Sequence, residues 1–182
     1  MSSDQFPVLR AYRGIRPDLS TGVFIDPTAT VIGRVTLGED ASVWPMSVLR
    51  GDVNEIRVGA RSNIQDGSIL HVSRPTENNP AGYPTLIGED TTIGHRVMLH
   101  GCVIGHRVLI GNGAVVLDGA VIEDDVMVGA SALVTPGKRL ESGYLYTGSP
   151  ARRARPLKDA ELKNLWQNAA NYVALKNEYL DA

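Results

Sequence analysis

The chain has 182 residues, with 18 basic and 20 acidic side chains and a net charge of −2 at pH 7. Its length suits a single domain, and the near-neutral charge gives no electrostatic footprint for nucleic acid or an anionic membrane. Apolar residues make up 43% but aromatic residues only 5%, so the core must consist of Val, Ile and Leu, which favour strands.

The N-terminal segment and the cysteine content bear on the compartment. Residues 1–14 contain no apolar run typical of a secretory signal, and no segment approaches the length of a membrane span. The single cysteine, Cys102, excludes an intrachain disulfide and favours a reducing compartment. We therefore expect a cytoplasmic protein without a membrane or nucleic-acid partner.

Aliphatic residues recur at every sixth position, a spacing that neither a helix nor simple alternation produces. The repeat gains three extra residues after residue 49, breaks after residue 70 and contains one step of five near residue 100. A hexapeptide repeat explains it, because each six residues form one short strand and one corner, and three hexads close one triangular coil. The aliphatic positions are Ile25, Val31, Leu37, Val43, Leu49, Val58, Ile64, Leu70, Ile87, Ile93, Leu99, Ile104, Ile110, Val116, Ile122, Val128 and Val134.

We predict an all-β solenoid, a parallel β-helix over residues 1–150, with a loop excursion at about 71–86. A β-sandwich is the alternative, although loops between hairpins rarely preserve one phase for so long. The C-terminal segment differs, and we predict a connector and a helix over 151–182, packed on the β-helix, with Asp159 as the N-cap. Its residues at helical intervals are Leu162, Leu165, Trp166, Ala169, Tyr172, Val173 and Lys176.

Three of the four histidines fall into register once the excursion is removed. The step from Leu70 to Ile87 is seventeen residues where a hexad needs six, so the excursion adds eleven. Without it, His71 and His100 lie eighteen residues apart, which is one full coil, and each directly follows an inward aliphatic residue. His95 lies thirteen residues from His71 by the same count and should point toward another edge.

A single subunit would have difficulty bringing these three imidazoles together, whereas a threefold assembly with closed symmetry would not. Three imidazoles with an open fourth position are typical of a catalytic zinc site, although imidazole also suits iron, cobalt and nickel. Surface histidines without a ligand role are the alternative interpretation. The register also places Arg50 one coil below His71, and Asp66, with Gln65 beside it, one coil below His95.

Four stretches carry a family resemblance: VWPMSVLRGD (43–52), SNIQDGSILHV (62–72), IGHRVMLHGCVIG (93–105) and IGNGAVVLDGAVI (110–122). From about residue 10 to the C-terminus, the sequence resembles the γ-class carbonic anhydrases, in their bacterial hexapeptide-repeat branch. The resemblance implies left-handed winding and a homotrimer with one divalent metal at each subunit interface, zinc first and iron or cobalt as alternatives. It implies His71, His95 and His100 as the ligands, contributed by two subunits.

The same resemblance implies an enzyme that hydrates CO₂ reversibly to bicarbonate by metal-bound hydroxide at the trimer interface. Arg50 and Asp52 match an interface pair that helps to position bicarbonate, and a structural lock of the trimer is the alternative role for this pair. Gln65 matches the residue that orients the hydroxide, supported by Asn63 and Asp66. For Asp66 a role in turn structure is the alternative.

Tyr172 resembles a helix tyrosine that reaches the pocket in some members, with a core tyrosine as the alternative. The chain departs from the family at the route for proton export, because Val53 stands where the archetypal enzyme has a glutamate. An acidic loop is also replaced by residues 73–84, which retain only Glu77. The resemblance therefore implies weak activity. The competing functions are a hexapeptide acyltransferase or thioesterase acting on CoA thioesters, and a non-catalytic metal-binding trimer.

Overall fold

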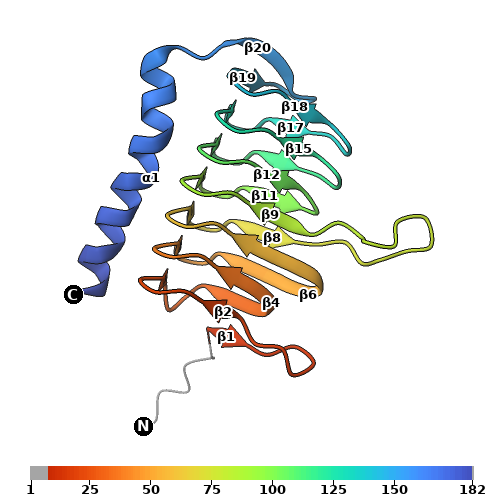
Figure 1. Ribbon diagram of the computed structural model, residues 1–182, viewed down its shortest axis with the longest axis vertical. Helices are drawn as coiled ribbons and strands as arrows, with labels where there is room; N and C mark the ends of the chain where they lie inside the picture. Colours follow the sequence, from red (N-terminus) through yellow and green to blue (C-terminus); the bar gives the residue numbers. More distant parts are fainter. Residues whose placement is uncertain (1–7, 182) are drawn as a thin grey trace.

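The computed structural model describes residues 8–181, so residues 1–7 of the predicted β-helix and N-terminal segment, and residue 182, lie outside the described residues. Within that range the chain forms short strands stacked into a solenoid, with one long helix alongside (Figure 1). The strands of the first half are β1 (Leu9–Arg10), β2 (Asp18–Leu19), β3 (Phe24–Ile25), β4 (Thr30–Leu37), β5 (Ser42–Val43), β6 (Val48–Val58), β7 (Asn63–Ile64), β8 (Ile69–His71), β9 (Thr85–Ile87) and β10 (Thr92–Ile93). Those of the second half are β11 (Met98–His100), β12 (Val103–Ile104), β13 (Leu109–Ile110), β14 (Val115–Val116), β15 (Val121–Ile122), β16 (Met127–Val128), β17 (Leu133–Val134), β18 (Arg139–Leu140), β19 (Tyr144–Thr147) and β20 (Arg152–Pro156).

Parallel pairing between successive coils produces the solenoid. Strand β8 pairs in parallel with β6 below it and β11 above it, and on another face β10 pairs in parallel with β7 and β13. The longer strands β4 and β6 bend around a corner, so two of the three faces belong to one sheet. The predicted left-handed parallel β-helix of hexapeptide repeats is confirmed.

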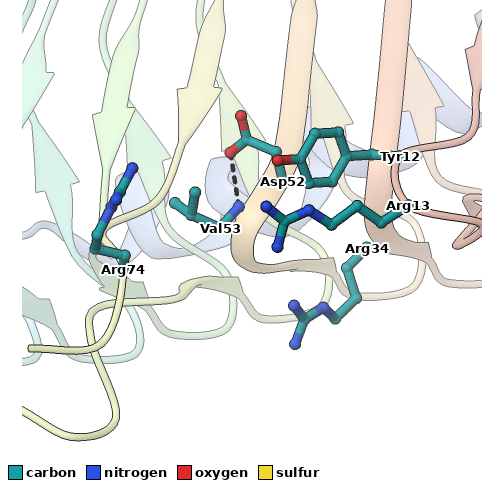
Figure 2. Close-up of a pocket in the computed structure, with 6 residues that line it drawn as sticks. All are labelled: Tyr12, Arg13, Arg34, Asp52, Val53 and Arg74. Carbon is teal, nitrogen blue, oxygen red and sulfur yellow. Dashed lines mark hydrogen bonds between the residues drawn. The ribbon is translucent and has the colours of Figure 1, made fainter.

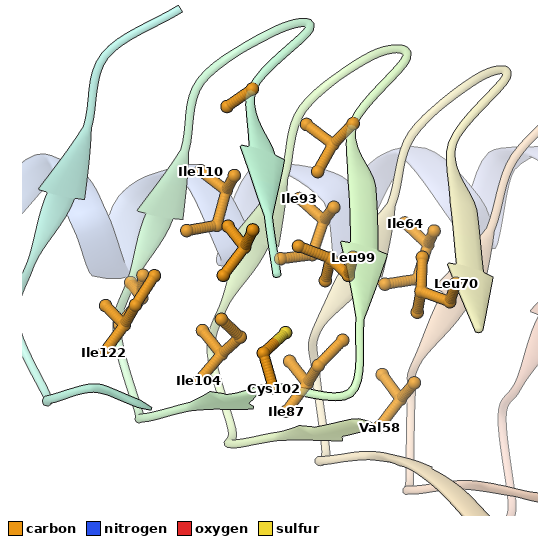
Figure 3. Close-up of a cluster of buried hydrophobic side chains, with 14 of the residues drawn as sticks. Val58, Ile64, Leu70, Ile87, Ile93, Leu99, Cys102, Ile104, Ile110 and Ile122 are labelled. Atoms are coloured by element: carbon orange, nitrogen blue, oxygen red, sulfur yellow. The ribbon is translucent and has the colours of Figure 1, made fainter. Parts of the chain in front are cut away.

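The interior is a stack of aliphatic side chains. Of the aliphatic positions predicted from the repeat, all are buried except Ile25, which is half-buried near the first coil. Figure 3 shows the columns that result, with Ile64, Ile93 and Ile110 in one and Leu70 beside Leu99 in another. Burying one such side chain stabilises the fold by about 1.5–3 kcal/mol.

One corner of the solenoid carries residues of alternating charge. At each coil this corner needs a backbone with positive φ, and the five residues there have φ between 52° and 59°. Ion pairs hold them to one another or to the helix, through Arg61–Asp90 and Arg107–Asp125, both 2.7 Å, and Lys176–Asp40 at 2.8 Å. We call this row the charge ladder; it consists of Asp40, Arg61, Asp90, Arg107 and Asp125.

Two insertions interrupt the coils. In the first, four residues of β6 lie opposite the single residue Arg34 of β4, because Gly33 faces Gly51 whereas Val35 faces Ile56. The second is the excursion between β8 and β9, which projects away from the solenoid (Figure 1). Its root is closed by a backbone bridge between residues 73 and 83, and its tip by one between residues 76 and 79.

The C-terminal helix α1 (Asp159–Leu180) runs back along the solenoid toward its N-terminal end (Figure 1). The predicted N-cap is wrong, since Lys158 is the cap and its backbone N–H donates to Glu161 at 2.8 Å. The expected connector contains β20, which pairs antiparallel with β19. The helix buries Leu165, Ala169 and Lys176 and leaves Trp166 54% exposed. No helix within residues 8–181 has the length and apolar character needed to cross a bilayer.

Candidate metal centre

His71 and His100 lie side by side on adjacent coils. They end strands β8 and β11, whose register pairs the two residues directly, so the predicted stacking on one face is confirmed. Nδ1 of His71 is 3.0 Å from Nε2 of His100, and both side chains are half-buried. At this distance the two ring nitrogens hydrogen-bond to each other. Both become potential metal ligands when the shared proton is lost.

Asp118 fixes the orientation of His100. Its Oδ1 lies 2.7 Å from Nδ1 of His100, and its Oδ2 accepts a hydrogen bond of 2.9 Å from the Ser73 hydroxyl. A carboxylate on the far nitrogen of a histidine sets the ring's orientation and frees the other nitrogen to bind a metal. Our sequence reasoning missed Asp118, although it follows His100 by eighteen residues and the coil arithmetic could have found it.

Asp52 holds His71 in the same way. Its Oδ1 is 3.0 Å from Nε2 of His71, while Oδ2 accepts from the Arg50 guanidinium. Burial raises the pKa of Asp52, but hydrogen bonds from Arg50, His71 and the Val53 N–H outweigh it and lower the pKa to about 2. Burial lowers the pKa of His71 even though Asp52 opposes the shift, which favours the neutral imidazole that metals bind.

We call this group of residues the paired-histidine edge. Its residues come from coils that are adjacent in the stack although they are far apart in the sequence. Four of them were predicted from the sequence, and Asp118 was found in the structure. Its members are Arg50, Asp52, His71, His100 and Asp118.

The remaining predicted residues lie on a different edge. His95 follows β10, and its Nδ1 is 2.9 Å from Oδ2 of Asp66, with both side chains nearly half-exposed. Beside them Gln65 and Asn63 are buried, and the Gln65 amide donates to Asn63 Oδ1 at 3.1 Å. Asn63 in turn donates to Thr92 Oγ1 at 3.1 Å. The predicted placement of Asp66 below His95 is confirmed.

Tyr172 of helix α1 reaches this second edge. Its ring packs edge-on against Trp44 with centroids 5.4 Å apart. Burial, and then the negative charge of Asp66, raise the pKa of the phenol. We call this group the His95 edge; it consists of Asn63, Gln65, Asp66, His95 and Tyr172.

The two edges do not meet in the part of the chain that the structure describes. Within residues 8–181, no hydrogen bond or ion pair between side chains joins them, and no three His, Cys, Asp or Glu side chains converge as a metal site. The donors fit a divalent metal only in part, with two imidazoles on one edge and the third imidazole on the other. The three predicted imidazoles are thus divided between two edges of the chain.

The fold and these edges define a hexapeptide-repeat protein that displays histidines on its outer faces. The family described as "Bacterial transferase hexapeptide (six repeats)" matches residues 84–118 and 101–136. Over 174 residues the chain is 56% identical to Protein YrdA of Escherichia coli, covering 96% of this chain and 95% of that one. It is 44% identical over 159 residues to Gamma carbonic anhydrase 1, mitochondrial, of Arabidopsis thaliana, covering 87% of this chain and 58% of that longer one.

A solved structure agrees with these relatives. The crystal structure of a hexapeptide transferase family protein from Anaplasma phagocytophilum superposes with a TM-score of 0.87 at 39% identity, covering 94% of this chain and 97% of that one. The chain is also 42% identical over 157 residues to a protein named Probable carbonic anhydrase of Methanocaldococcus jannaschii, covering 86% of this chain and 94% of that one. The chain belongs to the γ-carbonic-anhydrase-like family of hexapeptide-repeat proteins.

Proposed function

We propose that this protein is a metal-dependent carbonic anhydrase that interconverts CO₂ and bicarbonate at the subunit interfaces of a homotrimer. The observation that carries the proposal is the division of the ligands, with His71 and His100 paired on one edge and His95 on another. Closed threefold symmetry would bring the paired-histidine edge of each subunit to His95 of the partner subunit. A relative named as a carbonic anhydrase at 44% identity supports the reaction.

An apolar stripe beside the histidines supports the assembly. From β6 to β17, on the face that carries the histidines, the residue before each inward aliphatic residue points outward and is apolar. These residues stack along the solenoid next to the paired-histidine edge. Ile69 on this stripe is 42% exposed. A stripe of this kind is typical of a surface that a second protein chain covers. In register along the face, its members are Val48, Ile69, Met98, Val115 and Leu133.

A divalent metal at these ligands supplies a Lewis acid that lowers the pKa of a water molecule toward neutrality. The chain's own residues then arrange the reactants. Asp52 and Asp118 hold the rings of His71 and His100 by hydrogen bonds. The Arg50 side chain is 44% exposed and its guanidinium is oriented by Asp52, so it can donate to a bicarbonate oxygen beside the histidines.

Gln65 has the role of positioning a hydroxyl group. Its amide nitrogen is committed to Asn63, which is itself held by Thr92. The amide oxygen of Gln65 remains as an acceptor with a fixed direction. Because Gln65 is on the same edge as His95, the proposed trimer brings it to the paired-histidine edge of the neighbour.

Proton export limits the proposed activity. The residue after Asp52 is Val53, where the archetypal enzyme has a glutamate. The excursion that holds Glu77 projects away from the solenoid (Figure 1). No carboxylate of the excursion therefore stands beside the histidine pair among the described residues. We expect slow turnover that increases with buffer concentration, because buffer must carry the proton.

Stopped-flow CO₂ hydration tests the reaction directly. Protein prepared anaerobically with Zn²⁺, Co²⁺ or Fe²⁺ should accelerate hydration above the buffer rate, and His71→Ala should abolish the acceleration. Stoichiometric metal binding without acceleration in any metal form would contradict the enzyme and leave a non-catalytic metal-binding trimer.

Mixing two inactive variants tests the shared site. In a trimer that contains both His71→Ala and His95→Ala chains, one interface out of three joins an intact pair to an intact His95. Equal mixing and random exchange should therefore restore about a quarter of the sites. If all three ligands came from one chain, verified mixed trimers would recover none.

A second candidate is acyl transfer from, or hydrolysis of, a CoA thioester. It is favoured by the likeness to a structure titled as a hexapeptide transferase family protein, at a TM-score of 0.87. Thioester turnover that persists in His71→Ala and needs no metal would favour this candidate. Turnover that disappears together with the metal would count against it.

A further inference from the structure

A cavity of about 270 Å³ lies beside Asp52, the carboxylate that also contacts His71. Three guanidinium groups, one phenol, one carboxylate and one aliphatic side chain line it (Figure 2). In the figure the side chains of Arg13 and Arg34 lie on one side of Val53, and that of Arg74 lies on the other. The lining residues are Tyr12, Arg13, Arg34, Asp52, Val53 and Arg74.

The first wall is a tight turn near the start of the solenoid. Tyr12 and Ile15 exchange two backbone hydrogen bonds of 2.9 and 3.0 Å. The two residues between them, Arg13 and Gly14, have φ of 50° and 79°. Two consecutive residues with positive φ are typical of a type I′ turn, which presents Arg13 at its tip.

The second wall is the irregularity between β4 and β6. Arg34 is the single residue of β4 opposite the inserted residues of β6, which include Asp52 and Val53. A bulge of this kind turns a side chain away from its regular direction. The Arg34 side chain therefore points to the cavity and not in the direction that it would have in a regular strand.

The third wall is the root of the excursion, which carries Arg74. Its position is fixed by Asn54, whose side-chain amide donates to the backbone oxygens of Ser73 at 3.0 Å and Ala81 at 2.9 Å. Asn54 belongs to the β6 insertion, so one insertion anchors the other. Arg74 is consequently held beside the cavity by an ordered loop root.

In the described part of the chain, the three guanidinium groups have no anionic partner of their own. Within residues 8–181, no carboxylate forms an ion pair with Arg13, Arg34 or Arg74. The carboxylate of Asp52 is already used by Arg50, His71 and the Val53 N–H. The lining thus carries three positive charges and one negative charge, a surplus of two in a chain whose net charge is −2.

We propose that this cavity binds a phosphate dianion, either free phosphate or the phosphate group of a small monoester. The surplus of two positive charges matches a dianion, and the planar guanidinium group forms paired hydrogen bonds with phosphate oxygens. Tyr12 also lines the cavity, and its hydroxyl provides a further donor. The cavity shares Asp52 with the paired-histidine edge, but neither histidine lines it. The proposal does not depend on carbonic anhydrase activity.

Calorimetric titration of the 182-residue chain with inorganic phosphate at low ionic strength tests the site. We expect one saturable site per chain, with affinity lowered roughly tenfold or more by Arg34→Gln and by Arg74→Gln. Arg57→Gln is the matched control, because Arg57 is an exposed arginine of the same strand β6 that pairs with Glu55 outside the cavity. It should change the affinity by less than about twofold.

Two further titrations separate this site from others. Phosphate binding should survive in His100→Ala; its loss there would overturn the proposal, because the phosphate would then occupy the histidine centre. Bicarbonate, a monoanion, should bind the cavity much more weakly than phosphate, and equal affinity would overturn the assignment of a dianion.

The absence of saturable phosphate binding, or equal affinity in wild type, Arg34→Gln and Arg74→Gln, would also overturn the proposal. A parallel titration with glycerol phosphate identifies the source of the group. Tighter binding of the ester than of free phosphate supports a monoester, and the reverse order supports free phosphate.

Discussion

The charge ladder and the paired-histidine edge are both columns of polar side chains that follow the solenoid axis. In the charge ladder, carboxylates and guanidinium groups alternate, and Arg61 and Arg107 each find a carboxylate at 2.7 Å. In the paired-histidine edge, two imidazoles stand next to each other at 3.0 Å between Asp52 and Asp118. The same stacking geometry thus pairs each charged side chain with an opposite charge in one column. In the other column it places two imidazoles next to each other.

This difference shows how a repeat fold separates stability from function. Stacking places residues one coil apart close together whatever their chemistry. Where the charges alternate, each residue is neutralised by its neighbours, so the column has no unpaired group left to bind a ligand. Stacked imidazoles between carboxylates have both rings oriented and still offer nitrogens to a further group. The predictions below test whether the two columns differ in this way.

Removing the core beneath the histidines should have the largest effect. Leu99 is fully buried on strand β11. Leu99→Ala should lower the free energy of unfolding by about 2–5 kcal/mol, measured by denaturant unfolding. Val103→Ala is the control, because Val103 on β12 is 38% exposed and lies outside the apolar stripe. It should lower the free energy of unfolding clearly less than Leu99→Ala. Equal costs would show that the interior of the coil does not carry the stability.

Asp118→Asn should weaken metal binding by about 10–100-fold, because the amide no longer holds His100 as the carboxylate does. Competition with a chelator measures the change, and circular dichroism monitors the fold. The control is Asp90→Asn in the charge ladder, which should leave metal affinity unchanged and reduce stability. Identical behaviour of the two variants would remove the functional distinction between the columns.

Reversing one charge should disrupt the charge ladder more modestly. Arg107→Glu places a third carboxylate between Asp90 and Asp125. The loss of one partly exposed pair and the new repulsion should together lower the free energy of unfolding by about 1–2 kcal/mol. The deficit should shrink in high salt, because screening weakens both contributions. A deficit independent of salt would contradict the electrostatic account.

Arg107→Gly should have the smallest effect. It removes the same ion pair but relieves the strain of a side chain at φ 52°. These opposing effects should leave the free energy of unfolding within about 1 kcal/mol of wild type. A large loss in thermal or denaturant unfolding would mean that the ion pair contributes more than an exposed pair normally does.

The sequence alone predicted the parts of the protein that depend on the repeat. The six-residue phase determines which side chains point inward, and Leu70 and Leu99 are indeed fully buried. It also predicted that His71 and His100 stack and that His95 lies apart beside Asp66. Such predictions succeed because a solenoid converts sequence separation directly into position, so counting residues is equivalent to measuring along the stack.

Features that depend on insertions were decided only by the tertiary structure. Ser73 reaches Asp118, and Arg34 and Arg74 meet at one cavity, because a bulge and an excursion bend the backbone out of the repeat. The hexad count does not describe those conformations, since they depend on contacts such as the Asn54 hydrogen bonds to the excursion. The repeat specifies where the histidines stand, and the folded insertions determine what surrounds them.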